Sequence, residues 1–141
     1  MPFISITRLR VRSWRFLPLF FLQAVRSGRQ AKKSPGNLGV SVLREPRNVF
    51  WTRSAWDSEA SMKSYMLSGV HRQVMRKLLE WCDEAAVAHW TQDSAQEPRW
   101  QEAHAQLVKI GRLSKVNHPS PAQKEFRIPA PHITPGGEAR F

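Results

Sequence analysis

The sequence predicts an α+β fold of the ferredoxin-like type, with the element order β-α-β-β-α-β. Three observations predict this class. Apolar and polar residues alternate in four short segments, apolar residues recur every three or four positions between them, and turn residues separate these runs. A length of 141 residues suits one domain with a modest hydrophobic core.

The four strands are expected from this alternation. In residues 3–12, Phe3 and Leu9 point to one side and Ile4 and Arg8 to the other, which is the period of two of a strand. The other strands are expected over residues 38–43, 49–56 and 85–92, with a hairpin turn at residues 45–48. Each strand therefore presents two distinct faces.

The first helix is expected between the first two strands. Ser13 is a candidate N-cap, and Pro18 is tolerated because it would lie in the first turn. Apolar residues then recur at helical spacing until Ser34-Pro35-Gly36, which ends the helix.

The second helical segment carries the most informative side chains. It is capped by Asp57 or Ser58, interrupted at Ser68-Gly69 and expected to end at Asp83-Glu84. Its second half has two adjacent stripes, formed by Val70, Val74, Leu78 and Trp81, and by His71, Met75, Leu79 and Cys82. A histidine on an apolar stripe, following a strand that ends in Trp56, indicates a ligand pocket between helix and sheet.

The chain is expected to divide into a ferredoxin-like domain, residues 1–112, and a proline-rich extended arm, residues 113–141. A short helix over residues 100–110 closes the domain, and the arm lacks core periodicity. With both main helices on one face of an antiparallel sheet, the other face is bare and apolar. We expect another copy of the chain, the arm or a ligand to cover it.

Positive charge is concentrated in the first third of the chain. The net charge is +11, of which residues 1–50 supply +9, with ten Lys or Arg against Glu45. This excess favours an anionic partner. The acid-free start raises the question of a targeting segment, but its apolar run, residues 16–22, is too short to span a bilayer. We expect it to belong to the fold of a cytoplasmic protein without a transmembrane segment.

Two groups of residues resemble a known family. Trp56-Asp57-Ser58-Glu59-Ala60, followed by Ser68-Gly69-Val70-His71, is similar to a pattern of the antibiotic-biosynthesis-monooxygenase-like proteins. Within that group, residues 7–10, 15–18 and 81–85 resemble the spheroidene-monooxygenase-like branch. The resemblance covers about residues 3–112.

The resemblance implies a homodimer with the dimeric α+β barrel architecture and a cavity between each sheet and its helices. It implies a monooxygenase acting on an apolar small molecule, either without a cofactor or with haem. In haem-binding branches a helix histidine ligates the iron, and the matching residue here is His71. The haem-degrading branch also has an asparagine on the first strand, which residues 3–12 lack.

The candidate site residues follow from the pocket and the resemblance. His71 is expected to act in catalysis, as a haem ligand or a proton shuttle, beside Trp56. The alternative is a structural histidine bonded to backbone near the Ser-Gly break. The expected ligand-binding residues are Arg8 and Arg10, whose guanidinium groups suit a carboxylate, together with Trp51, Met75 and His89. Trp51 and Trp56 lie on opposite faces of one strand, so only one can face the cavity.

Two other functions fit the same element order. An RNA-recognition module would suit the basic charge, but residues 49–56 lack the glycines of its aromatic signature, so nucleic acid is not the expected partner. A non-catalytic dimeric barrel that binds a small metabolite stays open, because one fold hosts many functions. The single Cys82 excludes an internal disulfide and is expected to be a core residue.

Overall fold

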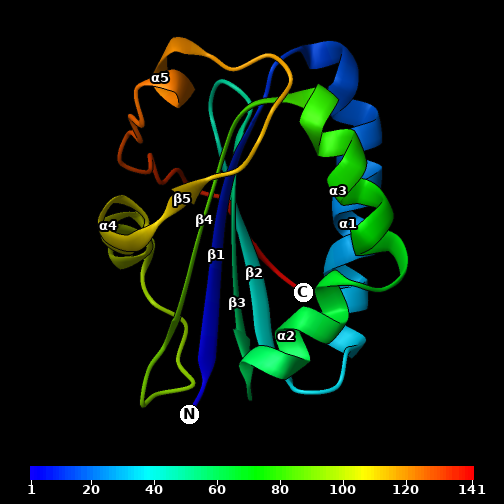
Figure 1. Cartoon of the computed structure of the whole chain (residues 1–141), viewed down its shortest axis with the longest axis vertical. Coiled ribbons are helices and arrows are strands. Elements are labelled where there is room, and N and C mark those ends of the chain that lie inside the picture. The colour runs from blue at the N-terminus through cyan, green and yellow to red at the C-terminus, as the bar shows by residue number, and fades with distance from the viewer.

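The computed structural model describes residues 1–141, apart from the side chain of Val70. Six antiparallel strands form one sheet in the order β5-β4-β1-β3-β2-β6 (Figure 1). The predicted ferredoxin-like order is confirmed for the first four strands. The strands are β1 (Phe3–Val11), β2 (Asn37–Glu45), β3 (Val49–Trp56), β4 (Cys82–Thr91), β5 (Arg112–Leu113) and β6 (Glu138–Arg140).

Helices cover both faces of this sheet (Figure 1). One layer contains a short 3-10 turn, η1 (Trp14–Phe16), and the helices α1 (Leu17–Lys33), α2 (Glu59–Met66) and α3 (Gly69–Trp81). The opposite layer contains α4 (Trp100–Ile110) and α5 (Pro121–Lys124). No helix among the described residues is both long and apolar enough to cross a bilayer.

The residues that cap and separate the helices are the ones predicted from the sequence. The Ser58 side chain accepts a hydrogen bond from the Ser61 backbone N–H and so caps α2. Between α2 and α3 the chain turns at Gly69, whose φ of +58° is a conformation that favours glycine. The break at Ser68-Gly69 therefore separates two helices instead of kinking one. The stripe predicted to include Val70 rests in part on a side chain outside the described residues.

The end of α3 differs from the prediction. Asp83 and Glu84 do not terminate the helix, because α3 ends at Trp81 and β4 begins directly at Cys82. The ladder with β1 explains this, since Cys82 pairs with Val11 and Glu84 pairs with Arg10 in its register. Strand pairing and the ion pairs of Arg8 and Arg10 with these two acids outweigh the local helix signal.

The face that the sequence leaves bare is covered by the chain itself. Trp100, Ala103 and Leu107 of α4 are buried against β-sheet side chains that include Ile4, Ile6, Leu43, Trp51, Ala86 and Ala88. The main cover, α4, is none of the three coverings expected, because it lies within the predicted domain; from the arm, Leu113 and Ile128 pack against the same core. A second copy is not needed to bury this face, and the homodimer stays a prediction.

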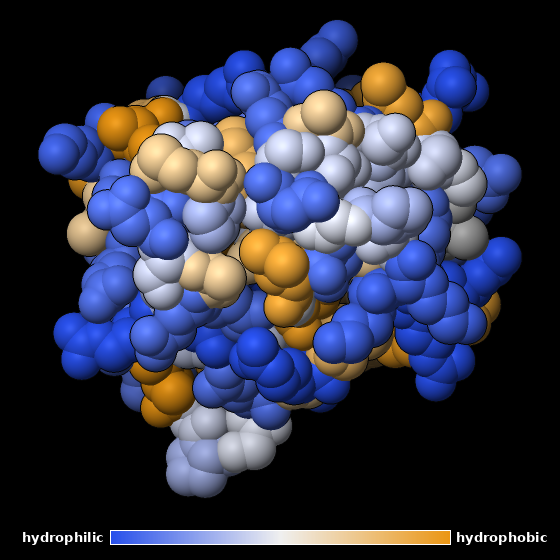
Figure 2. Space-filling view, turned by 90° about the horizontal axis from the view of Figure 1, so that it is seen from below, coloured by the Kyte–Doolittle hydropathy of each residue, from blue (hydrophilic) through white to orange (hydrophobic). Residues whose placement is uncertain are grey.

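The arm after residue 113 is joined to the sheet at several places along its length. The Gln123 side chain bonds both the N–H and the C=O of Ala85 in β4. Strand β6 pairs with β2, and Glu138 in it accepts a hydrogen bond from Arg53. Ile128 packs on the core beneath α4. Seen from below, the end of the molecule that carries α2 is mostly hydrophilic, with apolar residues in separate patches (Figure 2).

Candidate functional site

A cavity of about 450 Å³ lies between the sheet and the helices α1, α2 and α3. This volume lies in the range of small-molecule sites, roughly 300–1,000 Å³. Strands β1 to β4 form its floor, the three helices form its roof, and the segment of residues 112–116 lies along one side. Most of the lining is apolar, including Phe20, Val74, Met75 and Leu78.

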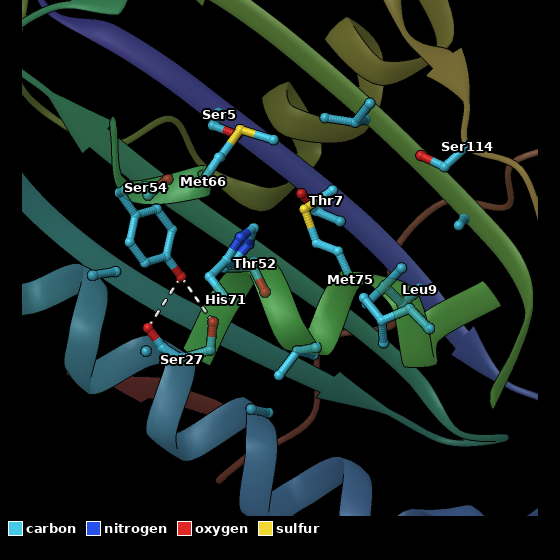
Figure 3. Close-up of a pocket in the computed structure, with 18 of the residues that line it drawn as sticks. Ser5, Thr7, Leu9, Ser27, Thr52, Ser54, Met66, His71, Met75 and Ser114 are labelled. Carbon is cyan, nitrogen blue, oxygen red and sulfur yellow. Dashed lines mark hydrogen bonds between the residues drawn. The ribbon is translucent and has the colours of Figure 1, made fainter. Parts of the chain in front are cut away.

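Four hydroxyl side chains form a polar patch at the centre of the cavity floor (Figure 3). Ser5 lies opposite Ser54, and Thr7 lies opposite Thr52, on the neighbouring strands β1 and β3. Residues directly opposite in an antiparallel pair share a face, so the four hydroxyls form a compact group. The Trp56 indole donates a 2.9 Å hydrogen bond to Ser54 Oγ. The patch can bind oxygen atoms of a ligand.

An aromatic stack connects the floor to the roof. The Tyr65 ring packs on Trp56 with centroids 5.2 Å apart and meets the His71 ring at 4.5 Å. Tyr65 is oriented by Ser27 of α1, whose Oγ lies 2.9 Å from the phenol oxygen and whose carbonyl accepts at 3.0 Å (Figure 3). Burial raises the pKa of Tyr65 to about 12, so the phenol stays protonated.

The position of His71 is fixed by the start of α3. Gln30 of α1 accepts a 3.1 Å hydrogen bond from the His71 backbone N–H and donates a 2.9 Å bond to the Ser68 carbonyl. It thereby supplies a partner for a free N–H of the first helical turn. The turn at Gly69 and the two hydrogen bonds of Gln30 fix the first turn of α3. The His71 imidazole therefore projects into the cavity (Figure 3).

Two neutral imidazoles border the cavity. Burial lowers the pKa of His71 below its usual 6.5, and the interaction of the ring with the Met66 backbone opposes this shift by favouring the protonated form. Burial, followed by the positive charge of Arg112, lowers the pKa of His89. His71 Nδ1 and His89 Nε2 are buried and have no hydrogen-bond partner among the described residues. Each is therefore a buried polar atom that the fold leaves without a partner.

The pH dependence of stability follows from the direction of these two pKa values. Above pH 6.5 the imidazoles are neutral in both the folded and unfolded chains; below it the unfolded chain binds protons first. The free energy of unfolding should therefore fall as pH falls from 7.5 to 5.5. We expect a smaller fall in His71→Gln, measured by urea denaturation, with His132→Gln on the arm as the control. An equal fall in all three proteins would contradict the burial of a neutral His71.

The structure brings four of the predicted site residues together and separates the other three. Trp56, His71, Met75 and His89 line the cavity. Their catalytic and binding roles stay predictions. The separated residues are Arg8, Arg10 and Trp51, which lie on the opposite face of the sheet.

The partners of these three residues explain their separation. Arg8 is buried in an ion pair with Glu84 at 2.7 Å, and Arg10 pairs with Asp83 at 2.7 Å. The Trp51 indole donates to Glu45 within the core beneath α4. The period of two places all three away from His71, so a ligand in this cavity does not contact them.

Sequence reasoning missed the floor hydroxyls, Tyr65 and Arg112. The signal for the hydroxyls is visible in hindsight, because Ser5 and Thr7 alternate with Ile4 and Ile6 on one strand. Small polar residues at alternate positions of a strand buried on both faces indicate a cavity on one of them. Tyr65 has no such signal, since its partner Ser27 is 38 residues away.

The residues predicted to hold haem are not brought together by the fold. His71 is the candidate iron ligand, but Arg8 and Arg10, the candidate partners of the propionates, are paired with carboxylates on the other face. The cavity-facing residues of β1 are Ser5, Thr7 and Leu9, with no asparagine. Among the described residues there is also no cluster of three potential metal-ligating side chains. Cys82 is buried, and burial raises the pKa of its thiol to about 12.

A family model for a domain of unknown function, DUF3291, matches residues 25–133. The chain belongs to the DUF3291 family. The matched residues include the second half of α1, all of α2, α3 and α4, and strands β2 to β4, and so most of the cavity roof and the cover of the second face. No curated protein sequence matches this DUF3291 chain.

Solved structures show the same fold at low sequence identity. A conserved protein from Methanosarcina mazei has a TM-score of 0.59 at 14% identity, covering 66% of this chain and 94% of that one. A protein from Nitrosomonas europaea, provisionally named as an antibiotic biosynthesis monooxygenase, has a TM-score of 0.59 at 13% identity, covering 65% and 90%. SnoaB from Streptomyces nogalater, a cofactor-independent oxygenase, has a TM-score of 0.54 at 14% identity, covering 66% and 94%.

These likenesses confirm the predicted resemblance to antibiotic-biosynthesis-monooxygenase-like proteins at the level of the fold. The DUF3291 chain has a monooxygenase-like α+β fold. The narrower resemblance to the spheroidene-monooxygenase-like branch stays a prediction.

Proposed function

We propose that this chain is a monooxygenase that binds an apolar small molecule with oxygen substituents in the cavity and needs no haem. One observation carries the proposal: the half-buried His71 imidazole, which burial keeps neutral, lines an apolar cavity with a hydroxyl patch on its floor. The shared fold of SnoaB, named as a cofactor-independent oxygenase, supports the same class.

His71 is proposed as the general base. A neutral imidazole can accept a proton from a substrate carbon or hydroxyl made acidic by conjugation, and burial keeps it neutral at pH 7. The resulting substrate anion can reduce O₂ directly. For a methylene flanked by aromatic rings the reaction balances as R₂CH₂ + O₂ → R₂C=O + H₂O.

The rest of the cavity has positioning roles in this proposal. Hydroxyls of Ser5, Thr7 and Thr52 would bind substrate oxygens and hold the reacting carbon beneath His71. The stack of Trp56 and Tyr65 limits how the imidazole can rotate. Apolar walls exclude water from the reactive anion and from the oxygen adduct.

The proposal is tested with 1,8-dihydroxyanthrone, which has a flanked methylene and two hydroxyls. We expect oxygen uptake above the buffer rate, matched by formation of the quinone, and a fall in kcat of about 10²–10⁴-fold in His71→Gln. His132→Gln should leave the rate unchanged, and circular dichroism should confirm that both variants are folded.

Two results would contradict the proposal. Equal rates in the wild type and His71→Gln would remove His71 from the reaction. Binding of the anthrone without any oxygen uptake would favour a non-catalytic barrel that binds a small metabolite. The homodimer is a separate proposal, tested by the mass of the protein under native conditions.

A further inference from the structure

The charged residues that line the cavity are both cations. Among the described lining residues, Arg112 and Lys115 are charged, and no aspartate or glutamate is present. Both cations come from the segment after α4, along one side of the cavity. All the other polar lining residues are hydroxyls or neutral imidazoles at physiological pH.

The strand register directs Arg112 toward the cavity. In the β4–β5 pair Arg112 lies opposite Val87, which lines the cavity. Leu113 lies opposite Ala86 and packs against the core under α4, although it also borders the cavity. Opposite residues share a face of the sheet, so the Arg112 side chain extends over the cavity side. The positive charge of Arg112 also contributes to the lowered pKa of His89. The backbone of Ser114 is bonded to Ala85, which holds Lys115 nearby.

These two cations have no acidic partner in the fold. Within the described part of the chain, no carboxylate lies within 4.0 Å of Arg112 or Lys115. Three arginines on the central strands are different, because Arg8, Arg10 and Arg53 pair with glutamate or aspartate. An exposed guanidinium and ammonium without an acid, beside an apolar cavity, can bind the anionic group of a ligand.

Helix α3 adds positive charge on the other side of the opening. Met75 lines the cavity yet is 43% exposed, so the cavity is open beside it. Arg72 and Arg76, each one residue beyond a lining residue of α3, are exposed. The acid on this helix is Glu80, which is held by Arg12 at 2.6 Å.

We infer that the cavity takes an amphipathic anion, with the apolar body inside and a carboxylate, sulfonate or phosphate group held at the opening by Arg112 and Lys115. This inference rests on the proposed function in one respect, namely that the cavity binds an apolar small molecule. A guanidinium and an ammonium at the opening fix which end of the ligand enters first. They thereby set which carbon of the ligand lies beneath His71.

Two fluorescent probes that differ by one charged group test the inference. 1-Anilinonaphthalene-8-sulfonate is anionic, and N-phenyl-1-naphthylamine is the same ring system without the sulfonate. We expect the wild-type chain to bind both, the sulfonate more tightly. In the double variant Arg112→Gln/Lys115→Gln the Kd of the sulfonate should rise about 10-fold, while that of the neutral probe changes less than about 2-fold.

A charge-matched control separates local binding from the general positive charge of the protein. Lys109→Gln/Lys124→Gln removes two exposed cations from α4 and α5, on the opposite side of the sheet. This control should leave both Kd values near those of the wild type. An equal rise for the sulfonate in both double variants would overturn the inference, because bulk charge would then explain it.

The same titrations separate the failure of the inference from that of the proposed function. Binding of the neutral probe with no preference for the sulfonate would overturn the amphipathic anion and leave the apolar cavity standing. Equal losses for both probes in Arg112→Gln/Lys115→Gln would assign the two residues a role in shape instead of charge recognition. Failure of both probes to bind would overturn both the inference and the apolar binding cavity.

Discussion

Replacing Trp51 with alanine should lower the free energy of unfolding by about 3–5 kcal/mol. Trp51 is fully buried, packed among Ile4, Leu43 and the residues of α4. Alanine would leave a large void and remove the indole donor of Glu45. The void would lie between the sheet and α4, so closing it would require a shift of the whole helix. We therefore expect the surrounding structure to recover little of the lost stability. Urea denaturation, with the slope m fitted for each variant, measures the loss.

Trp14→Ala is the matched control for this prediction. Trp14 is 79% exposed at the start of η1, so the same substitution should change the free energy of unfolding by less than about 0.5 kcal/mol. The comparison tests how the second sheet face is covered. A small loss for Trp51→Ala would mean that α4 does not seal this face in solution, and the covering by a second copy would regain support.

The alternation of apolar and polar residues predicted most of the sheet correctly. A period of two assigned Phe3 and Leu9 to one face and Ile4 and Arg8 to the other, and the structure has the same division. Ser58 and Gly69 also mark their predicted turns, because capping and positive φ are local properties of the chain.

The choice of the cavity face lay beyond this reasoning. Both faces of β1 carry large apolar residues, so the pattern does not reveal which one meets helices with a gap between. The partner of Arg8 is Glu84, 76 residues away, and no local signal connects them. From sequence alone, Arg8 therefore suggests a site for an external anion. In the fold its partner is a carboxylate of the same chain, that of Glu84.

The attachment of the arm to the sheet was also not visible in the sequence. Residues after 111 contain prolines at irregular spacing, which suggests an extended arm. Single side chains fix this arm instead of a periodic face: Gln123 bonds the β4 backbone and Leu113 packs into the core. Arg112 follows the same logic, because its role depends on the pairing of a two-residue strand. Such isolated contacts leave no period to detect.

Replacing Glu84 with alanine should be as damaging as the loss of Trp51, at about 3–5 kcal/mol. Glu84 is 7% exposed and accepts a 2.7 Å hydrogen bond from Arg8, which is 5% exposed. It also accepts a 2.9 Å hydrogen bond from Ser120 of the arm. The variant would leave the Arg8 guanidinium buried without its partner, and this desolvated charge is the main cost. Urea denaturation at pH 7 measures the effect.

Removing both charges should be far less harmful than removing one. The double variant Arg8→Met/Glu84→Leu keeps the volume apolar, so we expect it to recover more than half of the loss of Glu84→Ala. Glu59→Ala is the control, because its pair with Lys63 joins side chains that are 56% and 63% exposed and should contribute less than about 1 kcal/mol. If Glu84→Ala and the double variant were equally unstable, packing around residue 84 would account for the loss, and the buried charge would not. Recovery in the double variant would instead show that Arg8 and Glu84 form a structural ion pair. Neither residue would then be needed for the cavity on the other face of the sheet.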